Sequence, residues 1–107
     1  MVARVRAVRE RDSRIGLVEA LAEERAAHER ATELQERLDD VPALASGDLT
    51  SFSVRQYTVA AMSAELAAAR AGTDSSRLVA LAARDRWRAD RSRLAAVESL
   101  IERRDAA

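Results

Sequence analysis

The chain has 107 residues, its 18 basic residues are all arginine and offset 18 acidic residues, and it contains no cysteine. Alanine supplies 24 of the apolar residues and only three residues are aromatic, so few bulky side chains remain to fill a globular core. This composition is typical of long helices or a coiled coil, and it excludes a disulfide scaffold and a cysteine-based metal site. It argues against a membrane protein, because no apolar run approaches the ~20 residues of a membrane-spanning helix.

The first predicted helix covers residues 2–39, and its apolar stripe changes face along the way. Early in the helix, five apolar residues share one face: Val5, Val8, Ile15, Ala22 and Ala26. Later, the stripe moves to a second set: Leu17, Ala20, Ala27, Ala31, Leu34, Leu38 and Val41. Such a drift is expected of a stripe that wraps around a partner helix with an irregular repeat.

The strongest helix breakers of the chain follow this helix. Pro42 disfavours helical geometry at Val41 and cannot continue the hydrogen-bond ladder of a helix. Gly47 adds turn chemistry, and Thr50 or Ser51 is a suitable cap for a new helix. We therefore predict a loop at about 41–49.

The second predicted helix covers about 50–105 and has a heptad repeat. Every seventh residue from Phe52 forms a series in which seven of eight members are apolar: Phe52, Val59, Leu66, Thr73, Ala80, Trp87, Leu94 and Ile101. The positions three residues later are less apolar: Arg55, Met62, Ala69, Ser76, Ala83, Asp90 and Val97. The register crosses Gly72 without insertion or deletion, which favours one continuous helix. A break near Gly72, giving a three-helix arrangement, is the alternative, because glycine costs about 1 kcal/mol relative to alanine within a helix.

Two long amphipathic helices joined by a short loop predict an all-α fold, an antiparallel two-helix coiled-coil hairpin in a single domain over residues 1–107. The second helix is longer than the first. Part of it is therefore expected to extend past the first helix or to pair with another chain.

The charge is distributed unevenly along this hairpin. Residues 1–14 have a net charge of +3, residues 15–50 have −6, residues 51–76 have 0 and residues 77–107 have +3. Folding brings the first and last of these segments together, so the terminal end is expected to carry +6. Such separation favours oriented docking on a charged partner, although solvated faces of a coiled coil would give the same counts.

No residue pattern predicts catalysis or a cofactor. His28 is the only histidine and is expected to be a solvated or seam residue. A chain without lysine has no P-loop lysine. The arginine-rich stretch near the C-terminus is interrupted by acidic residues, so nucleic-acid binding is not expected. We predict neither a cofactor site nor a metal site.

Three aromatic residues are candidates for binding another protein. Trp87 stands at a heptad position, where it either anchors the contact between the helices or is a partly exposed anchor with arginines stacked on it. Phe52 and Tyr57 follow the loop. They either pack the hairpin tip or present an exposed apolar patch.

Two segments carry a resemblance to a known family. Residues 4–12 read Arg-Val-Arg-Ala-Val-Arg-Glu-Arg-Asp and open a helix rich in Ala and Glu. Residues 83–87 read Ala-Arg-Asp-Arg-Trp, and residues 94–105 read Leu-Ala-Ala-Val-Glu-Ser-Leu-Ile-Glu-Arg-Arg-Asp. This pairing resembles the FliJ family of flagellar type III export proteins, although the chain is shorter than typical members, mostly around the hairpin tip. The resemblance implies an antiparallel two-helix coiled coil similar to the central stalk of rotary ATPases.

The resemblance also implies a non-enzymatic function at the flagellar base, on the inner face of the membrane. The protein would insert its terminal end into the hexameric flagellar export ATPase, bridge it to the membrane export gate and handle export chaperones, touching the membrane only through these partners. We expect five arginines to face the ATPase ring: Arg4, Arg6, Arg9, Arg91 and Arg93. Phe52 and Tyr57 would face the gate. The alternative is a generic coiled-coil oligomerisation or scaffold module, or a helical chaperone, and self-association is compatible with both.

Overall fold

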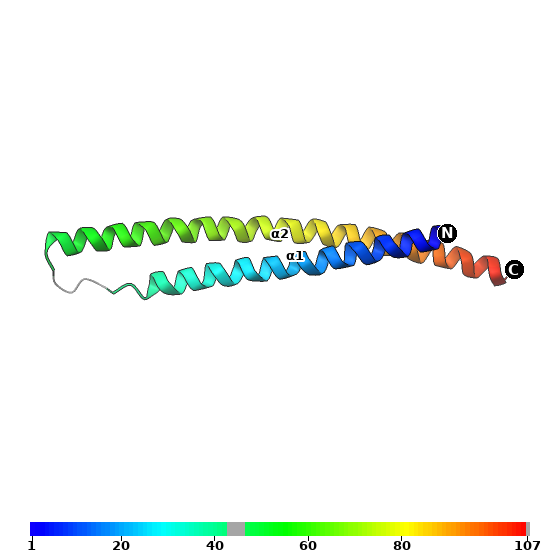
Figure 1. Cartoon of the computed structure of the whole chain (residues 1–107), viewed down its shortest axis with the longest axis horizontal. Helices are drawn as coiled ribbons and strands as arrows, with labels where there is room; N and C mark the ends of the chain where they lie inside the picture. The colour runs from blue at the N-terminus through cyan, green and yellow to red at the C-terminus, as the bar shows by residue number, and fades with distance from the viewer. Residues whose placement is uncertain (43–46, 107) are drawn as a thin grey trace. The chain divides into compact units, whose positions relative to one another are not determined.

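The computed structural model describes residues 1–42 and 47–106 and contains two α-helices, α1 (Val2–Asp39) and α2 (Leu49–Ala106) (Figure 1). The fold is the predicted antiparallel two-helix hairpin. Because α2 passes through Gly72 without a break, the three-helix alternative is wrong. The predicted loop at 41–49 includes residues 43–46, which lie outside the described residues.

The start of α2 is set by Asp48 rather than by Thr50 or Ser51. The Ser51 amide donates a hydrogen bond of 2.8 Å to Asp48 Oδ1, which is the bond between an N-cap side chain and the third residue of its helix. This bond favours the ionised carboxylate and holds the pKa of Asp48 below its ordinary value of 3.8. Thr50 and Ser51 therefore belong to the first turn of the helix.

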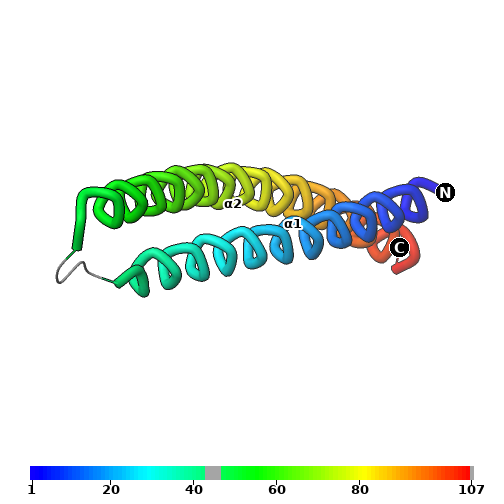
Figure 2. The backbone as a smooth tube through the Cα atoms, turned by 60° about the vertical axis from the view of Figure 1, so that its left-hand side comes forward, coloured from blue at the N-terminus to red at the C-terminus, as the bar shows by residue number. Residues whose placement is uncertain are grey.

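The described chain divides into two compact units. Unit 1 comprises Met1–Glu23 and Ser76–Ala107, and unit 2 comprises Glu24–Ser75. In each unit, a segment of α1 and a segment of α2 lie side by side and run in opposite directions (Figure 1 and Figure 2). The two units are described separately below.

Small and polar residues form the interhelical seam of unit 1. On α1, the buried and half-buried seam residues are spaced alternately by three and four: Ala3, Arg6, Glu10, Ser13, Leu17 and Ala20. On α2, they follow the predicted heptad register: Ser76, Ala80, Ala83, Trp87, Asp90, Leu94 and Val97. A seam with so few large apolar side chains buries little surface, so much of the hydrophobic side-chain area of this unit lies outside it.

The predicted drift of the α1 stripe is wrong. The seam does not move to the face of Val5, Val8 and Ile15, which are about half exposed. It continues towards the N-terminus through Ser13, Glu10, Arg6 and Ala3. Ser13 and Glu10 are tolerated in the seam because each has a hydrogen-bond partner. Ser13 Oγ donates to the Arg9 carbonyl at 3.0 Å, and Glu10 Oε1 accepts a bond from Trp87 Nε1 at 3.1 Å.

The seam of unit 2 contains larger aliphatic side chains. On α1 its residues are Glu24, Ala27, Ala31, Leu34 and Leu38, and on α2 they are Arg55, Val59, Met62, Leu66, Ala69 and Thr73. Among the described residues of this unit, two hydrogen bonds join α2 to α1 or to the residues just after it. Arg70 Nη2 donates to Gln35 Oε1 at 2.6 Å, and Arg55 Nε donates to the Pro42 carbonyl at 2.9 Å. Gln35 of α1 bonds to Arg70, and Pro42, which follows α1, bonds to the earlier α2 residue Arg55, as antiparallel packing requires.

The predicted seam is too long at both ends. Phe52 is half exposed. The half-buried residues of α2 begin only at Arg55, one turn later. Ile101 is also exposed. The half-buried residues of α2 end at Val97, because α1 begins only at Val2 and does not cover the residues that follow. These two residues belong to the heptad repeat of the sequence but not to the contact between the helices.

Candidate partner-binding surfaces

His28 lies at an exposed position of α1 and lines a groove of unit 2 with Thr32, Gln35 and Arg70. Thr32 Oγ1 donates to the His28 backbone carbonyl at 3.0 Å, a bond that does not involve the imidazole. Within the described residues, no three acidic or histidine side chains gather in a way that could hold a metal ion. Of its two predicted interpretations, His28 fits the solvated one.

The five candidate arginines have different surroundings. Arg6 is half-buried in the seam, whereas Arg4 and Arg9 are exposed on α1. Arg93 Nη1 lies 3.4 Å from Asp90 Oδ1, which offsets part of its charge. The Arg91 guanidinium lies 5.2 Å from the centre of the Trp87 ring. Four of the five are exposed, and among the described residues Arg91 and Arg93 have contacts that engage their charge, which leaves Arg4 and Arg9 as the better candidates for an acidic partner.

Trp87 anchors the contact between the helices of unit 1, the first of its two predicted roles, and its role as an anchor for another protein stays a prediction. Its indole is half-buried in the seam, and Nε1 donates the 3.1 Å hydrogen bond to Glu10 that joins the two helices of unit 1. Arg91 covers a ring face through a cation–π contact. The same carboxylate oxygen of Glu10 also lies 3.8 Å from Arg14 Nη1. Trp87 is thus a seam anchor with an arginine stacked on it.

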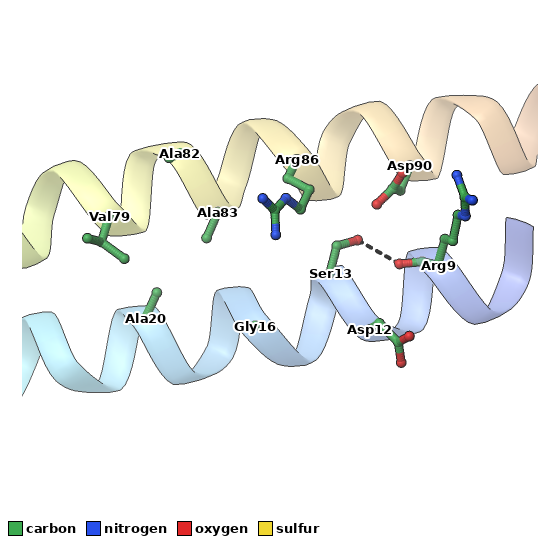
Figure 3. Close-up of a pocket in the computed structure, with 10 residues that line it drawn as sticks. All are labelled: Arg9, Asp12, Ser13, Gly16, Ala20, Val79, Ala82, Ala83, Arg86 and Asp90. Carbon is green, nitrogen blue, oxygen red and sulfur yellow. Dashed lines mark hydrogen bonds between the residues drawn. The ribbon is translucent and has the colours of Figure 1, made fainter.

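A groove runs between the helices of unit 1, and sequence reasoning missed it. Its volume is about 530 Å³. Small residues from both helices, Gly16, Ala20 and Ala83, leave this space open (Figure 3). The Arg86 side chain extends into the gap between the helices, and Arg9 stands at one end (Figure 3). Asp12 and Asp90 also line the groove, so the charges of its two arginines and two aspartates balance beside an apolar floor.

The residues after the loop form an exposed apolar patch. Tyr57 is 77% exposed, and Leu49, Phe52 and Val54 are also exposed. Of the two interpretations of Phe52 and Tyr57, packing at the tip is therefore disfavoured and an accessible patch is favoured. These residues belong to unit 2, whereas the five candidate arginines belong to unit 1.

A second exposed apolar surface lies on α1 in unit 1. We call it the α1 outer stripe, and it comprises Val5, Val8, Ile15 and Ala22. Sequence reasoning identified these residues as one face but assigned that face to the contact with the other helix. The exposure of the larger three, between 46% and 53%, leaves the stripe available to a partner.

The two units have opposite net charges. Unit 1 contains 13 arginines and nine acidic residues, for a net charge of +4, and unit 2 contains five arginines and nine acidic residues, for −4. The separation is smaller than the predicted +6 and −6 because Glu19 and Glu23 belong to the basic unit. The sign of the net charge is the predicted one in both units, positive in unit 1 and negative in unit 2.

Comparison with known proteins does not assign this chain to a family. No family model, no curated protein and no solved structure matches it. Neither helix, over its described residues, combines the length and the apolar character needed to cross a membrane.

Proposed function

We propose that this chain is a non-enzymatic stalk or accessory protein of the flagellar type III export apparatus, and that it engages the hexameric export ATPase through unit 1. The observation that carries the proposal is the joint location of the segments that resemble the FliJ family. Residues 4–12 and 83–105 are far apart in the sequence but belong to the same compact unit. A surface built from both helices is what a stalk inserted into a ring requires.

The charge of unit 1 supports the same contact. Its net charge of +4 and the exposed side chains of Arg4 and Arg9 favour a partner surface that is acidic. The exposed aromatic patch with Phe52 and Tyr57 belongs to the acidic unit 2, and we assign it to the export gate. The chain would also bind export chaperones. It would act at the inner face of the membrane through the ATPase, the gate and these chaperones.

The proposal is tested by mixing the purified chain with a hexameric export ATPase and measuring ATP turnover and co-elution. We expect the chain to co-elute with the ATPase and to raise its turnover. The variant Arg4→Glu should weaken both effects. The matched control is Arg25→Glu, which makes the same change in charge at an exposed position of unit 2 and should retain them. Absence of co-elution and of any change in turnover with the unaltered chain would rule out the stalk function.

A coiled-coil scaffold or helical chaperone is the second candidate function. The exposed apolar surfaces on both helices favour it, because such a module binds other helices through unpartnered apolar faces. This candidate predicts binding to helical client proteins without any change in ATP turnover. The turnover assay therefore distinguishes the two functions.

A further inference from the structure

The α1 outer stripe has the spacing of a coiled-coil seam of its own. Together with Asp12 and Glu19, the four stripe residues form a series spaced alternately by three and four: Val5, Val8, Asp12, Ile15, Glu19 and Ala22. All six residues are exposed, and the seam residues of α1 lie on a different face. A three–four repeat on a second helix face is typical of a helix that packs against two neighbours, and α2 supplies only one of them.

The charges along this part of α1 reverse in sign halfway. Residues 1–11 contain four arginines and Glu10, for a net charge of +3. Residues 12–23 contain one arginine and three acidic residues, for a net charge of −2. A helix with this pattern is complementary to a second copy of itself in the antiparallel orientation, whereas a parallel copy would bring like charges together.

We propose that the α1 outer stripe binds the same stripe of a second copy of this chain, in the antiparallel orientation. The shared spacing places Val5 beside Ala22 of the second copy, and Asp12 beside its Ile15. At one edge of the contact, Arg9 meets Glu23 of the second copy, and the two-fold symmetry repeats this pair. Arg9 and Glu23 are both exposed in the single chain.

The acidic residues within the stripe distinguish this partner from a lipid surface. Glu19 lies beside Val8 of the second copy and within one helical turn of its Arg11, so its stem covers apolar surface while its carboxylate meets a positive charge. An anionic bilayer would bring negative headgroups against Asp12 and Glu19 instead. The stripe between Val5 and Ala22 is only about 26 Å long, so we infer a weak, reversible dimer. This inference does not depend on binding to an export ATPase.

The first test exchanges the charges of the Arg9–Glu23 pair. In sedimentation equilibrium, the unaltered chain should show a monomer–dimer equilibrium. Arg9→Glu alone and Glu23→Arg alone should each dimerise at least about tenfold more weakly, because like charges then face each other twice. An equimolar mixture of the two variants should dimerise like the unaltered chain, since both pairs become complementary in the mixed dimer. Circular dichroism of each variant shows whether its helices are intact.

The second test measures orientation with single cysteines, which the absence of native cysteine makes possible. Val5→Cys and Ala22→Cys should form a mixed disulfide when the two variants are oxidised together. Neither should cross-link to itself, because identical positions lie about 26 Å apart in the antiparallel dimer. Val54→Asp, on the outer face of α2, is the control and should leave the dimer intact.

Three results would overturn the proposal. The first is a chain that stays monomeric at all concentrations. The second is Val5→Cys that cross-links to itself, which indicates a parallel pair. The third is a dimer that Val54→Asp dissociates and Arg9→Glu does not, which indicates the outer face of α2 as the interface.

Discussion

Replacing Leu66 by alanine is the perturbation that best probes how the two helices are held together. Leu66 is only 5% exposed in the seam of unit 2, so its replacement by alanine removes side-chain atoms that are almost entirely buried. Removal of its three outer carbons costs about 2.4 kcal/mol at ~0.8 kcal/mol per group. The cavity adds little, because the neighbouring seam residue Met62 is only half-buried and can shift into the space. We therefore expect Leu66→Ala to lower the free energy of unfolding by about 2–3 kcal/mol.

The assay is urea denaturation followed by circular dichroism at the helical band, with Leu78→Ala as the matched control. Leu78 is 68% exposed on the same helix, so its loss should cost about 0.5 kcal/mol, partly offset by the higher helix propensity of alanine. Both variants should unfold with an unchanged denaturant dependence. Equal losses of stability, or a larger loss for Leu78→Ala, would refute the assigned register of α2.

Three further predictions concern single residues. Trp87→Phe removes the hydrogen bond to Glu10 and should lower the free energy of unfolding by about 1–2 kcal/mol in the same assay, whereas Glu10→Gln, which retains an oxygen acceptor, should cost less; equal costs would contradict the role of this bond. Gly72→Ala should raise the free energy of unfolding by about 1 kcal/mol, because an added Cβ meets no atom within 4 Å and α2 is continuous at this point; a loss of stability would contradict the continuous helix. The lowered pKa of Asp48 means that its cap stabilises α2 fully above pH 3.8 and that this contribution is lost as the pH falls through the lower pKa of the folded state; NMR titration of its carboxyl carbon should give a pKa below 3.8, and a pKa at or above 3.8 would contradict the cap.

The heptad repeat of the second helix could be recognised from the sequence because its seam contains large apolar residues at regular intervals. Val59, Leu66, Trp87 and Leu94 supply a signal strong enough to extend through Gly72. The ends of the contact could not be recognised in the same way. Whether Ile101 has a neighbour depends on where the other helix begins, and the repeat does not contain that information.

The seam of the first helix could not be found from apolar periodicity. Near the N-terminus the larger apolar residues, such as Val5 and Val8, lie outside the seam, while Glu10 and Ser13 lie within it. The reason Glu10 is tolerated there is a hydrogen bond to a residue 77 positions away in the sequence, which no local pattern reveals. The groove of unit 1 was missed for the same reason, because it depends on which small residues of the two helices meet.

The cap of α2 could not be chosen from residue type. The predicted caps, Thr50 and Ser51, lie two and three residues beyond Asp48, the N-cap in the structure. Aspartate is as good an N-cap as serine or threonine, so residue preference alone does not choose among Asp48, Thr50 and Ser51. The choice depends on which side chain reaches the amide of the residue three positions ahead.

Photo-cross-linking to the export ATPase tests the central claim, that unit 1 is the part of this chain that enters the ring, most directly. A cysteine-reactive photo-cross-linker would be attached to Arg4→Cys in unit 1 or, separately, to Glu33→Cys in unit 2, both at exposed positions. We predict that the label at position 4 cross-links to the hexameric ATPase in the presence of nucleotide and that the label at position 33 does not. Cross-linking from position 33 alone, or from neither position, would contradict the account.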